Sequence, residues 1–192
     1  MLMLILYGRG YWERYRIIAE LIPQGSSDLD LCCGPATRFH RYLKRKAVCY
    51  TGLDINRGFV ERLSANGATG AVWDLEEDRP LPRSEYVLMQ ASLYHFLPNA
   101  LPIVERMMAA AKKQVLIAEP IRNLADSQNP VLALLARKFT NPGTRDQPNR
   151  FDEARLDALL EPYQKRGQVL KSRLIAGGRE KLFILRSGAY HG

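Results

Sequence analysis

The sequence has little of what would make it a disulfide-bonded or membrane-spanning protein. It holds three cysteines in 192 residues. Cys32 and Cys33 are adjacent, so on a strand they would point to opposite faces and pair poorly with each other or with one metal ion. We therefore expect a reduced, cytoplasmic setting. The opening apolar run, residues 1–6, is too short to span a bilayer and lacks the basic flank of a signal peptide, so we expect no membrane association.

Internal repeats and low-complexity tracts are also absent. With 46% hydrophobic and 25% charged residues, the chain can bury one full core, which predicts a single domain over residues 1–192. Within it, residues 1–25 are expected to form an N-terminal helical segment. Residues 121–150 are expected to form a lid or substrate insertion, with a plain surface excursion as the alternative.

The glycine pattern of dinucleotide-binding folds, G-x-G-x-x-G, is missing as well. A short apolar strand runs into a turn of small residues, LDLCCGPA over residues 29–36, and a helix is predicted over 36–46. The three glycine positions hold Cys32, Gly34 and Thr37, so a pyrophosphate would meet side chains at two of them. A second strand ends at Asp54, where a doubly wound sheet places an acid for a ribose; the alternative for Asp54 is a helix N-cap. A ribose-bearing cofactor without phosphate fits this turn better.

Strands and helices alternate along the rest of the chain, which predicts a three-layer α/β fold. An N-cap at Asp152 begins a late helix, and a glycine-pair turn joins the last two strands into a hairpin. The fold class is therefore α/β, with a doubly wound, seven-stranded, mostly parallel sheet and a C-terminal antiparallel hairpin. The later predicted strands are residues 70–74, 85–92, 114–120, 168–175 and 181–186, with helices over 98–111 and 152–161.

The first turn and this order of elements resemble class I S-adenosylmethionine (SAM)-dependent methyltransferases, whose first motif commonly reads LDLGCGPG. Cys32 and Ala36, both small, stand where two of the family's glycines would be. The resemblance covers residues 28–120 and 151–186. It implies the Rossmann-like methyltransferase fold, SAM as cofactor, S-adenosylhomocysteine (SAH) as product, and transfer of a methyl group to an acceptor.

The resemblance also implies roles for particular residues near the carboxyl ends of the strands. Asp30 would meet the methionine amino group, Asp54 the ribose, and Asp74 the adenine amine; the alternative for Asp74 is a solvated acidic turn. Tyr11 of the leading helix would lie over the cofactor, or would only pack that helix. The other implied cofactor-binding residues are Cys32, Gly34, Ile55, Leu75, Gln90 and Ala91.

Candidates for acceptor chemistry follow the predicted fourth strand. His95 is the first candidate for a general base and Tyr94 the second, with Glu119 next. The alternative for His95 is a purely structural role in its loop.

The net charge of +8 suits a polyanionic partner, or an acidic small molecule drawn to a basic surface. A dense basic run lies on the first helix: Arg38, His40, Arg41, Lys44, Arg45 and Lys46. Against RNA, the sequence lacks the [D/N]-P-P-[Y/F] motif that base-amine methyltransferases usually show after strand four. It also lacks the Pro-Cys dipeptide that the cytosine-carbon enzymes have there. We expect a monomer or homodimer that methylates a small molecule. An RNA-directed enzyme or a non-catalytic SAM-fold module are the alternatives.

Overall fold

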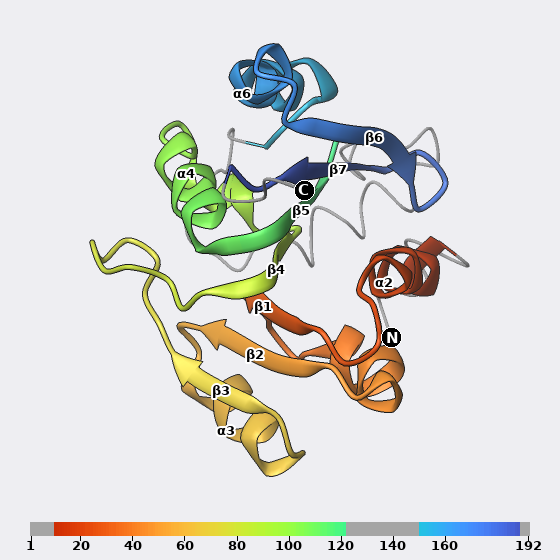
Figure 1. The fold of residues 1–192 in the computed structure, drawn as a ribbon, viewed down its shortest axis with the longest axis vertical. Helices are drawn as coiled ribbons and strands as arrows, with labels where there is room; N and C mark the ends of the chain where they lie inside the picture. The colour runs from red at the N-terminus through yellow and green to blue at the C-terminus, as the bar shows by residue number, and fades with distance from the viewer. Residues whose placement is uncertain (1–9, 122–149, 189–192) are drawn as a thin grey trace, which may run out of the picture.

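A seven-stranded sheet forms the centre of the fold in the computed structural model, which describes residues 10–121 and 150–188 (Figure 1). The spatial order is β3-β2-β1-β4-β5-β7-β6, and β7 runs antiparallel to both of its neighbours. The predicted doubly wound sheet with a C-terminal hairpin is confirmed. The strands are β1 (Ser27–Leu31), β2 (Cys49–Asp54), β3 (Thr69–Val72), β4 (Ser84–Gln90), β5 (Ala111–Pro120), β6 (Val169–Ile175) and β7 (Glu180–Arg186).

Helices cover both faces of the sheet, because successive side chains of a strand point to opposite sides. Val87 and Met89 of β4 pack with α4 (Leu101–Ala110) and α6 (Glu153–Lys165). Leu88, between them, packs on the other face with α2 (Gly10–Leu21), α3 (Arg57–Ala65) and η1 (Phe39–Leu43). This second face also receives Asp28 and Asp30 of β1, which alternate with the leucines of the first face.

Side-chain caps fix where two of the helices begin. The Asp152 carboxylate accepts a hydrogen bond from the backbone N–H of Arg155 at 2.8 Å, which confirms the predicted N-cap of α6. The N-cap of α3 is Asn56, whose side chain accepts from the N–H groups of Gly58 and Phe59. Asp54 is therefore not the cap of this helix, and the cap holds the chain firmly just beyond the end of β2.

The helix predicted over residues 36–46 differs in its winding. Its middle, η1, is a π-helix, and it ends in the 3₁₀ turn η2 (Lys44–Lys46). The Lys46 ammonium donates to the backbone oxygens of Ala19 and Ile22, so the end of this segment is tied to the end of α2. A 3₁₀ turn is a common way for a helix to end, whereas a π-helical stretch is rare.

Close packing explains one glycine on β2. A Cβ at Gly52 would lie 2.5 Å from Cδ2 of Leu63 in α3 and 2.8 Å from Sγ of Cys33. Only a glycine lets α3 and the first turn approach β2 this closely. The N-terminal residues 1–9, and residues 122–149 of the insertion predicted over 121–150, lie outside the described residues. Among the helices of the described ranges, none has the length and apolar character that crossing a membrane requires.

Candidate functional site

The turn after β1 has a glycine-like backbone although two of its three left-handed positions are not glycine. Cys32, Gly34 and Ala36 have φ angles of +52°, +54° and +49°. This left-handed region costs an L-residue roughly 1–2 kcal/mol and is easy only for glycine. The strain is retained beside a cleft, which is where strained backbone commonly serves binding.

Asp54 faces this turn from the end of β2. One oxygen of its carboxylate accepts a hydrogen bond from the N–H of Gly34 at 2.8 Å, and the other accepts from the N–H of Asn56 at 2.8 Å. Each carboxylate oxygen can accept a second bond. The adjacent Ile55 side chain is 68% exposed, which is unusual for a large apolar residue. The structure thus holds a fixed acid and an apolar surface side by side.

The end of β3 lies beside Asp54, since the N–H of Trp73 donates to the Asp54 carbonyl at 3.0 Å. Asp74 follows, and its carboxylate accepts from the N–H of Glu76 at 2.8 Å, an arrangement typical of an acidic turn. The Leu75 side chain is buried in the core. Asp54 and Asp74 therefore both lie at the carboxyl ends of β2 and β3, while the side chain of Leu75 points away from solvent.

A buried ion pair lies beneath the turn. The Arg38 guanidinium contacts the Asp30 carboxylate, which also accepts a hydrogen bond from the Tyr50 hydroxyl. Asp28, on the same face of β1, is fully buried, and this burial raises the pKa of its carboxyl to about 7 even though Arg38 is near. Counting Arg38 among the surface charges is therefore wrong, because buried carboxylates require a cation here. Lys46 is likewise engaged with backbone oxygens and is not a free surface charge.

The polar network continues from Arg38 across the sheet to α2. Arg38 Nη1 donates to Gln90 Oε1 at 3.1 Å, and Gln90 Nε2 donates to Glu180 Oε2 at 3.5 Å. Glu180 pairs with Arg14 Nε at 2.9 Å, and both side chains are buried. No sequence pattern marks Arg14 or Glu180 as partners, because the pair joins a helix near the start of the chain to a strand near its end.

A cavity of about 220 Å³ opens above this network. Tyr15 lines it from α2, whereas Tyr11 packs edge to ring against Trp12 and Tyr15, with centroids 4.8 and 5.5 Å away. The structure thus brings Asp30, Cys32, Gly34, Gln90 and Ala91 together in the lining of this cavity. The other predicted site residues lie outside the lining: Tyr11, Asp54, Ile55, Asp74, Leu75, Tyr94 and His95. The lining residues are Arg14, Tyr15, Asp30, Cys32, Cys33, Gly34, Pro35, Thr37, Arg38, Gln90, Ala91 and Ser92.

The 3₁₀ helix η3 (Leu93–Phe96) carries the two candidates for acceptor chemistry. His95 is exposed as a residue, but desolvation of part of its ring by the surrounding chain, together with the Arg150 charge, lowers the pKa of its imidazole. Tyr94 is half-buried, with the Arg150 guanidinium 5.3 Å from its ring centre, and burial raises the pKa of its hydroxyl. His95 is therefore neutral near pH 7, while Tyr94 stays protonated.

Glu119, at the end of β5, holds η3 in place. One oxygen of its carboxyl accepts from the N–H groups of Ser92 and Leu93, both at 2.8 Å. The side chain is fully buried, and this burial raises the pKa of the carboxyl to about 8. Glu119 acts here as an anchor for η3.

The thiols of the turn are poor nucleophiles in this setting. Burial raises the pKa of the Cys32 thiol to about 12, and burial also raises that of Cys33. Within residues 10–121 and 150–188, no group of histidine, cysteine, aspartate and glutamate side chains is arranged to hold a metal ion.

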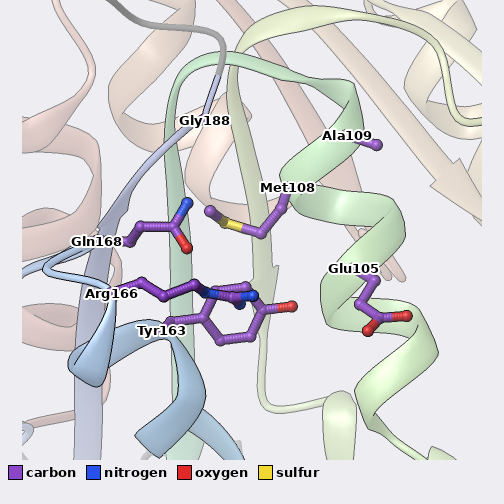
Figure 2. Close-up of a pocket in the computed structure, with 7 residues that line it drawn as sticks. All are labelled: Glu105, Met108, Ala109, Tyr163, Arg166, Gln168 and Gly188. Atoms are coloured by element: carbon purple, nitrogen blue, oxygen red, sulfur yellow. The ribbon is translucent and has the colours of Figure 1, made fainter.

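A larger hollow, about 680 Å³, lies away from the carboxyl ends of β1 and β2, between the end of α4 and the end of α6 (Figure 2). Met108 and Tyr163 form its apolar wall, and the Arg166 guanidinium stacks 4.6 Å from the Tyr163 ring centre. It is shallow and remote from Asp54. We therefore take the smaller cavity, which carries the charged groups and the strained turn, as the candidate site.

Known proteins resemble this chain in structure only. No protein-family description and no curated protein matches the sequence. Magnesium protoporphyrin IX methyltransferase (ChlM) from Synechocystis PCC 6803, solved with bound SAH, is 14% identical, with a TM-score of 0.66 over 93% of this chain and 84% of that one.

Two further structures have a similar likeness. A SAM-dependent methyltransferase from Aquifex aeolicus is 12% identical, with a TM-score of 0.61 over 91% of this chain and 90% of that one. The protein in complex with the Trm112 methyltransferase activator from Haloferax volcanii is 13% identical, with a TM-score of 0.66 over 93% and 90%. At such low identity these likenesses show the fold. This chain has the class I SAM-dependent methyltransferase fold.

Proposed function

We propose that this chain binds SAM at the carboxyl ends of β1 and β2 and transfers its methyl group to a small molecule. The observation that carries the proposal is the Asp54 carboxylate. The N–H groups of Gly34 and Asn56 fix it toward the strained turn, at 2.8 Å each. Both oxygens retain a lone pair, and the two hydroxyls of a ribose need two such acceptors.

The rest of the site fits the other parts of the same cofactor. Arg38 lines the cavity at 3% exposure, and its Nε has no hydrogen-bond partner within the described residues. With Arg14 and Asp30 it offers both charge signs, as the ammonium and carboxylate of an amino acid require. The exposed Ile55 offers an apolar surface for an adenine ring. A pyrophosphate has no place beside Cys32 and Thr37, so a dinucleotide fits less well.

When bound, SAM supplies a methyl group already activated by a sulfonium. The residues of the chain then have mainly to bind and orient, and good alignment lowers a barrier by roughly 7–11 kcal/mol. We propose that His95, neutral at pH 7, accepts a proton from acceptors that must lose one. Tyr94, which stays protonated, would orient the acceptor as a hydrogen-bond donor.

A small acceptor is favoured over RNA because the basic run on the first helix is smaller than its sequence suggests. Arg38 is withdrawn into the ion pair with Asp30, and Lys46 binds the backbone oxygens at the end of α2. His40 and Arg45 remain exposed. The Lys44 ammonium donates to the Asn66 backbone oxygen at 3.2 Å, and the Arg41 guanidinium lies 4.0 Å from the Trp12 ring centre.

Calorimetry with the full chain tests the proposal. SAM and SAH should both bind the parent, and Asp54→Ala should abolish the binding because it removes both acceptors for the ribose. Asp78→Ala removes an exposed carboxylate after β3 and serves as the control, with unchanged affinity expected. If neither compound binds the parent, the chain is a non-catalytic module with this fold. If Asp54→Ala binds like the parent, the role assigned to Asp54 is wrong.

A further inference from the structure

Two exposed apolar side chains remain unexplained once the cleft is assigned. Four large hydrophobic residues of the described chain are exposed: Ile55 at 68%, Val72 at 41%, Leu170 at 42% and Leu174 at 46%. Ile55 and Val72 lie at the ends of β2 and β3, beside the cofactor cleft. Leu170 and Leu174 both belong to β6, at the other side of the sheet, and the proposed function gives them no role.

β6 is an edge of the sheet, as Figure 1 shows. It has seven residues, and among the described strands it pairs only with β7; its residues 170–174 are all exposed. An edge strand presents a row of N–H and C=O groups to which a further strand can be added. The opposite edge, β3, has only four residues, and short edges offer a poor template.

The charges on β6 are all positive. The register places Lys171 opposite Ile184 and Arg173 opposite Leu182 of β7, so both cations share one face. Within the described residues neither of them has an ion-pair partner, and β6 contains no acidic residue. Cations on an edge strand commonly prevent aggregation, but exposed leucines beside them do not serve that purpose.

These charges select against a second copy of the chain. Antiparallel pairing of β6 with itself, centred on Ser172, would place Lys171 of each copy opposite Arg173 of the other. Centring on Lys171 or on Arg173 would place that residue opposite itself. Like charges directly opposite each other destabilise strand pairing. A strand with carboxylates at alternate positions would instead form opposite-charge pairs with both cations.

We propose that the β6 edge binds an extended acidic segment of a partner protein, which adds to the sheet as a further antiparallel strand. Backbone hydrogen bonds hold the segment, Lys171 and Arg173 face its carboxylates, and Leu170 and Leu174 cover its apolar side chains. This surface does not include the cofactor cleft, so the proposal stands apart from the methyltransferase function.

A fluorescent peptide of alternating valine and glutamate is the probe, with a valine–lysine peptide for comparison. Fluorescence anisotropy should show binding of the acidic peptide only. Arg173→Glu should weaken it roughly tenfold, since an attractive cross-strand pair becomes repulsive. Arg45→Glu makes the same charge change at an exposed position outside β6 and should change the affinity less than twofold. Hydrogen exchange should slow at β6 amides when the peptide is bound.

Several results would overturn the proposal. One is that the acidic peptide fails to bind the parent. Another is that Arg45→Glu weakens peptide binding as much as Arg173→Glu does. A third is that the peptide binds without slowing hydrogen exchange in β6. A fourth is that a single-stranded oligonucleotide of equal charge displaces the peptide and loses the same affinity for Arg173→Glu. The last is that sedimentation equilibrium reveals a dimer of the parent and a monomer of Leu174→Asp, which would make a second copy the occupant.

Discussion

Replacing Glu119 with glutamine should stabilise the fold relative to the parent, by an amount that grows as the pH rises. The pKa of this buried carboxyl is raised from 4.5 to about 8. Between these values the folded chain keeps a proton that the unfolded chain releases, so the free energy of unfolding falls with increasing pH. The stability linked to this proton is fully present below pH 4.5 and is lost as the pH rises through the pKa of about 8 that Glu119 has in the folded chain.

The magnitude follows from the same pKa difference. One pKa unit corresponds to about 1.4 kcal/mol, so Glu119 costs the folded state at most about 5 kcal/mol above pH 8. Glu119→Gln does not titrate, and its amide oxygen can still accept from the N–H groups of Ser92 and Leu93. The advantage of the variant should therefore be close to zero at pH 4.5 and reach a few kcal/mol at pH 8.

Urea unfolding of the parent and the variant at pH 4.5, 6.5 and 8 measures this difference. Asp28, whose pKa is raised to about 7 by burial, titrates in both proteins and cancels in the comparison. Glu61→Gln, at an exposed position on α3, is the control and should show no comparable trend. A difference between Glu119→Gln and the parent that stays constant across the three pH values would refute the reasoning.

Two further predictions concern Arg38 and His95. Arg38→Met should destabilise the fold by roughly 3–5 kcal/mol in urea unfolding, since it leaves the buried carboxylates of Asp28 and Asp30 without their cation; a variant as stable as the parent would contradict the ion pair's role. His95→Ala, assayed once an acceptor is known, should lower the rate by about 10²–10⁴-fold and remove the acidic limb of the pH–rate profile. An unchanged rate and profile would leave His95 with no catalytic part.

Much of the fold could be predicted from the sequence because its signals are local. Alternating apolar runs identify strands, and an acid such as Asp152 before a helix identifies its start. The position of Asp54 at the end of the second strand is also a local signal, read against the turn after the first strand. The order of such elements restricts the topology to a doubly wound sheet, and the structure has it.

The candidate site is less visible in the sequence because its contacts are distant along the chain. Arg38 reads as one cation in a basic run, yet its side chain is buried against Asp30. Arg14 and Glu180 carry no motif at all, and they meet only because α2 lies against the strands near the end of the chain.

The sequence by itself determined the strands and several of the helices, since the periodicity of apolar residues records them directly. It did not predict α3 or the π-helical winding of η1. Only the tertiary structure decided which charges are buried, which are paired, and which strand is left at an edge. A charged side chain has the same letter whether it is solvated or enclosed. Its partner depends on packing between elements, and neighbouring residues do not encode that.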